Sequence, residues 1–183
     1  STRPVGPIRQ VDRARTVPTP PLFGHFDAPM LVPWLVMNHW TAPRIQELAG
    51  GARLLEMRLT GYSFEEARGF VAAIGDEGAR FYLDVQLWLD MAFPPLLGAV
   101  LFLGYRWLFP GLPGRVIGTI SLGSIAVDYL ENAAIAAMLR AGADSMTPQM
   151  VATANFWTTT KWSLALVGTV TLVIGIALRL RRR

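Results

Sequence analysis

Apolar residues gather in four stretches along the chain, with polar segments between them. Three stretches reach the roughly 20 residues that a helix needs to cross a bilayer. We expect these spanning helices at about residues 81–109, 115–139 and 155–178. Tryptophans lie near their ends, as in an interfacial aromatic belt: Trp107, Trp157 and Trp162.

The fourth apolar stretch, residues 28–40, is short for a span, and Pro29 and Pro33 interrupt it. A stretch of this length is more often interfacial or re-entrant than spanning. We therefore expect an interfacial, re-entrant or degraded first span here, with a full crossing as the alternative.

Residues 41–80 predict two short amphipathic helices that lie as a cap on the outer membrane face. Pro43 marks the start of the first helix, and Gly50–Gly51 mark its end. Ser63 and Glu66 have the spacing of a capping box at the start of the second. Two later glycines are expected to break that helix, Gly75 and Gly78.

Residues 1–27 predict an extended, polyproline-like arm without a core of its own. An arm of this kind needs a surface to lie on, so we expect it to bind a partner. The residues expected to make this contact are Arg3, Pro4, Pro7, Arg9, Arg13, Arg15, Pro18, Pro20 and Pro21.

Composition strengthens the membrane interpretation. Hydrophobic residues make up 52% of the 183 residues and charged residues 16%, which disfavours a soluble enzyme. The absence of cysteine excludes disulfides, thiolate metal sites and cysteine nucleophiles. Because no basic patch is interleaved with aromatics in a soluble context, we expect neither nucleic-acid binding nor a soluble substrate.

The arginines orient the chain. Arg106 and Arg115 flank the turn between the first two spans without an acid beside them. The C-terminal arginines are expected to anchor to anionic lipid or to a partner: Arg179, Arg181, Arg182 and Arg183. The positive-inside rule then makes this side cytoplasmic and residues 41–80 periplasmic, in a bacterial inner membrane. The side of the arm depends on whether residues 28–40 cross.

Ionisable residues within predicted spans are functional candidates by default. Helical rise places several of them at similar depth. This predicted polar cluster comprises Asp90, Asp128, Glu131, Asn132 and Lys161. Because three carboxyl groups face one ammonium group, we expect at least one acid to be neutral at pH 7.

The cluster has a structural and a functional interpretation. Hydrogen-bonded glue between helices is favoured over a proton or ion pathway, and a lipid-acting enzyme is the remaining alternative. Pro94 and Pro95 should kink their helix and free the carbonyl groups of Asp90 and Met91. A kink beside an acid suits either an ion site or a packing device.

His39 is a candidate ligand for a pigment or haem metal, but a polar residue at the headgroup level is the favoured interpretation, because no second ligand is evident. We therefore predict no metal site and no cofactor of the chain's own. Contact with pigment or lipid held by partners stays open.

The segment from Leu54 to about Lys161 resembles a family of small bacterial polytopic membrane proteins of uncharacterised function. The residues that carry the resemblance are Gly61-Tyr62-Ser63, Glu65-Glu66-Ala67, Gly75, Gly78, Arg80, Tyr82, Asp90, Phe93-Pro94, Asp128, Glu131-Asn132 and Lys161. The resemblance implies a four-helix bundle with both termini in the cytoplasm. A short, proline-broken first span and a long arm suggest a family member recruited as a subunit.

These observations predict an all-α integral membrane bundle that serves as a non-catalytic accessory subunit of a larger bacterial membrane complex. A photosynthetic reaction-centre–light-harvesting complex is the partner we expect first, and respiratory complexes are an alternative. The competing function is a small proton or ion carrier that uses the carboxylate–lysine cluster.

Overall fold

The computed structural model describes residues 23–181, with side chains from residue 29 onward, and this part of the chain is helical without strands. The main helices are α1 (Phe23–Val36), α2 (Ala42–Leu48), α3 (Phe64–Phe81), α4 (Leu87–Leu108), α5 (Leu112–Ser145) and α6 (Pro148–Arg181). Shorter elements are the π-helical turns η1 (Met37–Thr41) and η3 (Tyr82–Gln86) and the 3-10 turn η2 (Leu55–Met57).

Three helical stretches among the described residues are long and apolar enough to cross a membrane: Phe64–Leu108, Leu112–Ser145 and Pro148–Arg181. They contain the three predicted spans, so the prediction of an all-α membrane bundle is confirmed. Hydroxyl side chains on α6 fit this setting, because they donate to carbonyl groups one turn back: Thr159, Ser163, Thr169 and Thr171.

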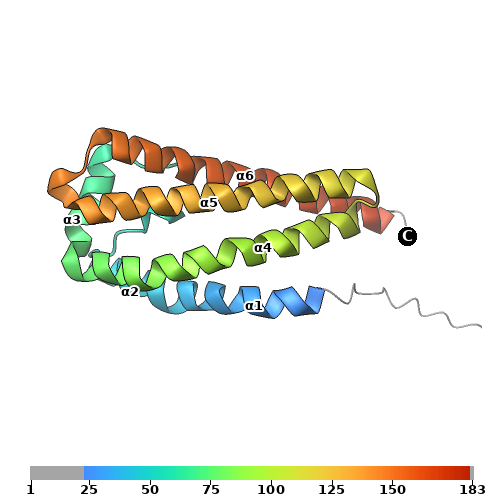
Figure 1. Cartoon of the computed structure of the whole chain (residues 1–183), viewed down its shortest axis with the longest axis horizontal. Helices are drawn as coiled ribbons and strands as arrows, with labels where there is room; N and C mark the ends of the chain where they lie inside the picture. Colours follow the sequence, from blue (N-terminus) through green and yellow to red (C-terminus); the bar gives the residue numbers. More distant parts are fainter. Residues whose placement is uncertain (1–22, 182–183) are drawn as a thin grey trace, which may run out of the picture.

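The helices form a row in which α4 and α5 are the central antiparallel pair (Figure 1). Helix α6 packs on α5, and α1 runs along α4 at the other edge. Helix α3 crosses one end of the row, here called the cap end, together with α2 and the loop of residues 49–63, called the cap loop. The opposite end, the hairpin end, holds the α4–α5 turn, the start of α1 and the end of α6.

The first apolar stretch differs from the prediction. Helix begins at Phe23, inside the predicted arm, and α1, η1 and α2 continue without a break to Leu48. Pro29 and Pro33 lie inside α1 and do not end it, because each proline removes only one backbone hydrogen bond. Pro43 likewise lies within this continuous helix, just after the π-helical turn. The predicted arm residues from Arg3 to Pro21 lie outside the described residues.

The ends of the cap helices follow local sequence signals. Gly50 and Gly51 adopt φ of 63° and 90° just after α2, as expected for the residues that end a helix. Ser63 and Glu66 form the predicted capping box, with both reciprocal hydrogen bonds present. The break in α3 falls at Gly75, where φ is 60°, whereas Gly78 stays helical, so only the first of the two predicted breaks is correct.

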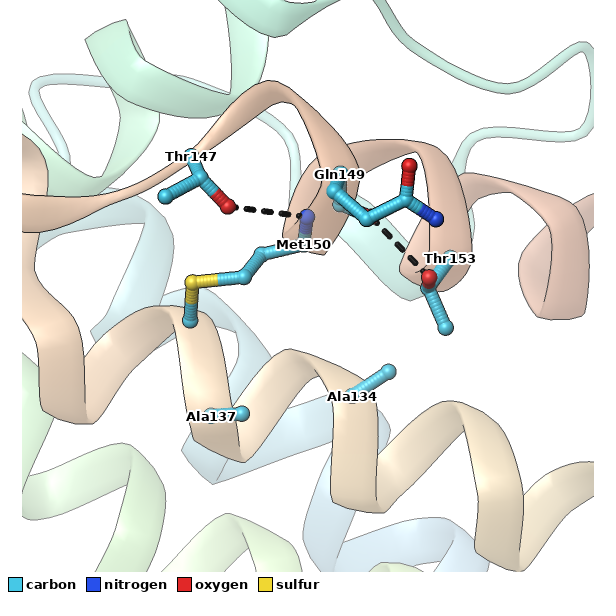
Figure 2. Close-up of a pocket in the computed structure, with 6 residues that line it drawn as sticks. All are labelled: Ala134, Ala137, Thr147, Gln149, Met150 and Thr153. Atoms are coloured by element: carbon cyan, nitrogen blue, oxygen red, sulfur yellow. Dashed lines mark hydrogen bonds between the residues drawn. The ribbon is translucent and has the colours of Figure 1, made fainter.

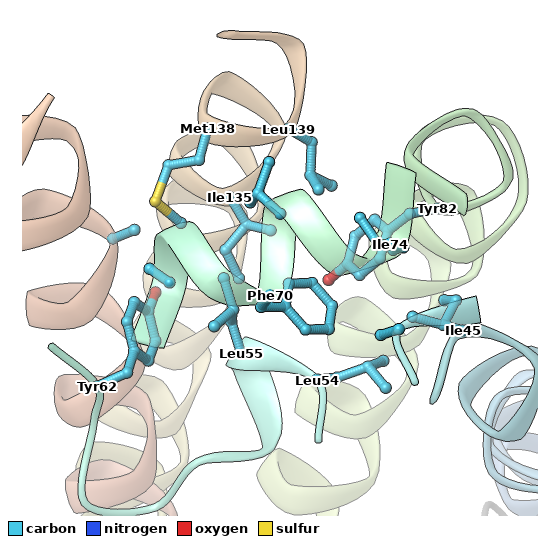
Figure 3. Close-up of a cluster of buried hydrophobic side chains, with 14 of the residues drawn as sticks. Ile45, Leu54, Leu55, Tyr62, Phe70, Ile74, Tyr82, Ile135, Met138 and Leu139 are labelled. Atoms are coloured by element: carbon cyan, nitrogen blue, oxygen red, sulfur yellow. The ribbon is translucent and has the colours of Figure 1, made fainter. Parts of the chain in front are cut away.

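The apolar core lies at the cap end (Figure 3). Phe70 of α3 sits at its centre, between Leu54 and Leu55 of the cap loop and Ile135 of α5. Tyr82 extends from η3 into the same cluster, with its hydroxyl oxygen directed inward. This core attaches the cap to the membrane-spanning helices.

Two buried glycines bring α4 and α5 close together near the hairpin end. A Cβ atom on Gly118 would lie 2.8 Å from Cδ2 of Phe102, and one on Gly114 would lie 2.7 Å from the carbonyl oxygen of Tyr105. Small residues permit such close approach between membrane helices. Gly123, further along α5, is exposed, and a Cβ atom there would meet nothing within 4 Å.

The two prolines of α4 lie inside a continuous helix, which contains no residue with non-helical backbone angles. The carbonyl group of Met91, which Pro95 leaves without its helical donor, accepts a hydrogen bond from the Tyr129 hydroxyl of α5 at 3.0 Å. The carbonyl group that was predicted to be free is therefore hydrogen-bonded, and this bond links the two central helices.

We expect Gly114→Ala to lower the free energy of unfolding by about 1–3 kcal/mol, because the new methyl group meets backbone atoms. Gly123→Ala is the matched control and should leave stability unchanged or raise it, since alanine is the better helix former. Denaturant unfolding of the full chain in detergent measures both. Equal stability of the two variants would contradict the close α4–α5 packing.

Candidate functional site

A buried ion pair joins the two C-terminal spans. Lys161 of α6 reaches Oε2 of Glu131 on α5, and the Glu131 side chain is 1% exposed. Its other oxygen, Oε1, has no hydrogen-bond partner among the described residues. The structure thus brings together the predicted cation and one of the three predicted acids.

A second polar chain crosses from the first helical segment to α4. The Thr41 hydroxyl donates to Oε1 of Gln86, and Nε2 of Gln86 donates to Oδ2 of Asp90 at 3.0 Å. Thr41 and Gln86 are buried, and they lie in the two π-helical turns. Gln86 and Asp90 stand four residues apart, so they share one helix face. The contribution of Thr41 was not predicted.

Glu56 is the cluster residue that the sequence did not indicate. It lies in η2 of the cap loop and is 7% exposed. Neither of its carboxylate oxygens has a hydrogen-bond partner among residues 23–181, and the same holds for the buried hydroxyl of Tyr82. Its electrostatic neighbours are Lys161, Tyr82 and Glu131. The carboxyl group therefore faces the ion pair from the loop side.

The cap loop is fixed to α6 by three polar contacts. Nε1 of Trp162 donates to the carbonyl oxygen of Glu56 at 3.0 Å. The backbone N–H of Tyr62 donates to Oδ1 of Asn155 at 2.9 Å, and the Tyr62 hydroxyl lies 3.4 Å from that of Thr158. Trp162, expected in an interfacial belt, instead holds the loop against the bundle.

Burial raises the pKa of Glu56 from 4.5 to about 7, against the lowering influence of the Lys161 ammonium group. Burial also raises the pKa of Tyr62. A carboxyl group with a pKa near neutrality can exchange a proton at physiological pH, which is the chemical capacity that distinguishes this site.

The remaining members of the predicted cluster are near but less enclosed. Asp128 is half-buried, one turn before Glu131 on α5, and Asn132 is buried beside it. Four carboxyl groups, including that of Glu56, therefore share one ammonium group among the described residues. Because the ion pair occupies that ammonium group, the other three acids have no dedicated counter-charge.

Within the described part of the chain, the other predicted site residues, His39 and the C-terminal arginines, make no hydrogen bond or ion pair with this polar cluster. His39 is exposed in η1, and the described residues contain no group of three or more metal-ligating side chains. Arg179 donates to the carbonyl oxygen of Trp107 at 2.5 Å and stacks on its ring at 3.9 Å, so this arginine joins α6 to α4. Arg181 is exposed, and Arg182 and Arg183 lie outside the described residues.

Comparisons with protein-family models, with curated proteins and with solved structures give no match to this chain.

Lys161→Met should lower the free energy of unfolding by about 3–5 kcal/mol, because it leaves Glu131 buried without its counter-charge. The double variant with Glu131→Leu should recover most of that loss. The control is Arg44→Met, which removes exposed ion pairs with Glu47 and Glu77 and should cost no more than about 1 kcal/mol. Unfolding in detergent tests all three, and a double variant no more stable than Lys161→Met would contradict the pairing.

Proposed function

We propose that this chain is a non-catalytic accessory subunit that docks within the membrane against a larger bacterial membrane complex and helps to hold it in register. The observation that carries this proposal is a row of small residues on the outward face of α5. They recur at helical spacing on a face that also carries the exposed Leu130, and they are all exposed: Gly123, Ala126, Ala133 and Ala137. Small exposed residues allow another membrane helix to approach closely.

A shallow hollow continues this row at the cap end (Figure 2). It has a volume of about 230 Å³ and lies between Ala134 and Ala137 of α5 and the first turns of α6, with Met150 on its wall. This arrangement fits a partner helix that packs along the small residues and places one larger side chain in the hollow. Helix α6 beyond Ser163 is apolar on several faces and is proposed to face lipid.

The distribution of charge supports an orientation for this subunit. Arg106, Arg115 and Arg181 are exposed near the hairpin end, which we therefore propose to be cytoplasmic. Helix α1 starts at the same end, so the proline-rich arm before Phe23 is proposed to act on the cytoplasmic side.

The test is extraction of the full chain from its native membrane in mild detergent, followed by native electrophoresis and identification of what migrates with it. We expect a large assembly, and pigment in it would support a photosynthetic reaction-centre–light-harvesting complex as the partner. Ala126→Leu with Ala133→Leu should release the chain from that assembly, because the larger side chains fill the groove.

Ala165→Leu is the matched control, since Ala165 is exposed on α6 and should tolerate the change. Migration of the wild-type chain alone would refute the accessory role. Retention of the α5 double variant in the assembly would refute docking through α5.

A proton or ion carrier is the second candidate, because several buried carboxyl oxygens lack hydrogen-bond partners. On this alternative, Asp90→Asn or Asp128→Asn should abolish proton flux in liposomes that contain the folded chain. If liposomes that contain the wild-type chain show no more proton flux than protein-free liposomes, the carrier function is excluded.

A further inference from the structure

The strongest unexplained feature is a set of buried oxygen atoms without partners around Glu56. Both Glu56 carboxylate oxygens, Oε1 of Glu131 and the Tyr82 hydroxyl have no hydrogen bond among the described residues. Tyr82 is 1% exposed and Glu131 is fully buried, so bulk water does not surround these groups. Buried polar groups without partners are costly, and each calls for an explanation.

Charged and titratable groups face Glu56 from every element packed around it. Lys161 approaches from α6, Glu131 from α5, Asp90 from α4 and Tyr82 from η3, while Tyr62 lies on the cap loop itself. Lys161 is already paired with Glu131. An ionised Glu56 would therefore bring another negative charge into a cluster whose one cation is engaged.

The Glu56 carboxylate oxygens have no donor within hydrogen-bond distance among the described residues. Carboxylate oxygens only accept hydrogen bonds, and a protonated carboxyl group gains one O–H donor. A proton on Glu56 would remove its buried charge and supply a donor beside the unpartnered oxygens of its neighbours. Both effects favour the acid form in this position.

We propose that Glu56 is a proton-binding site, which takes up one proton from the aqueous phase at the cap end and holds it as a carboxylic acid inside the bundle. The step forms one O–H bond on the carboxylate, consumes one solvent proton and involves no oxidation or reduction. The inference rests on the geometry of the polar cluster and is independent of docking to a partner.

The position of Glu56 suits proton exchange with the outer phase. It belongs to a loop and not to a spanning helix, and its own carbonyl group is held by Trp162. The pKa of about 7 means that both forms of the carboxyl group are populated near neutral pH. Because this pKa is raised in the folded chain, the stabilisation is complete below about pH 4.5 and is lost as pH rises through about 7.

The experiment is an infrared pH titration of the full chain in lipid nanodiscs, from about pH 5 to about pH 9. We expect the wild type to show the C=O stretching band of a protonated carboxyl group, which disappears with a midpoint near 7. Glu56→Gln should lack this band. Glu65→Gln, which changes an exposed acid on α3, should retain it.

Hydrogen exchange of the cap loop gives a second readout. In the wild type, exchange of residues 49–63 should become faster as pH passes through about 7, after correction for the intrinsic pH dependence of exchange. In Glu56→Gln the corrected exchange should not depend on pH. If that variant does not fold, Glu56→Asp keeps a carboxyl group on a shorter side chain and should shift the midpoint of the band.

Three results would overturn the proposal. The first is a wild-type spectrum without a carboxyl band that titrates near neutrality. The second is the same band in folded Glu56→Gln. The third is loss of the band in Asp90→Asn with its midpoint unchanged in Glu56→Asp, which would assign the proton to Asp90.

Discussion

The ion pair between Glu131 and Lys161 is the interaction on which the rest of the structure depends. It is buried between two spanning helices, where a charge without a partner is expensive, so it fixes how α5 and α6 lie against each other. The same side of α6 carries Asn155, Thr158 and Trp162, which contact the cap loop. The relative position of α5 and α6 therefore determines where the cap loop docks, and with it the position of the Glu56 carboxyl group.

A backbone group freed by a proline finds its partner on a neighbouring helix. A proline in a helix leaves a carbonyl group of the preceding turn without its backbone donor. At Met91 the Tyr129 hydroxyl of α5 donates to this carbonyl oxygen instead. The π-helical turns serve a related purpose, because each brings a buried polar side chain, Thr41 or Gln86, to the contact between α1 and α4. The two π-helical turns thus lie where these two polar side chains meet.

The sequence predicts the features that depend on local pattern. Hydrophobic length indicates the three spans, S-x-x-E spacing indicates the capping box at Ser63, and a lone lysine among buried acids indicates a polar cluster, although not which acid pairs with Lys161. Glu56 could not be found in this way, because an irregular loop gives no periodic signal and the burial of Glu56 depends on contacts with α6. The prolines of α1 were misleading for another reason. They signal a local loss of hydrogen bonds, whereas packing along α4 keeps the helix continuous.

The position of Lys161 in the last helix has a consequence for biosynthesis. A chain is made from its N-terminus, so Glu56, Asp90 and Glu131 enter the membrane region before their cation exists. Until α6 is inserted, these acids have no ammonium group to face, and the cap loop has no Trp162 to hold it. Insertion of α6 is therefore the step that supplies the cation and fixes the cap loop to the bundle. A chain truncated before Lys161 would leave these buried acids without their cation.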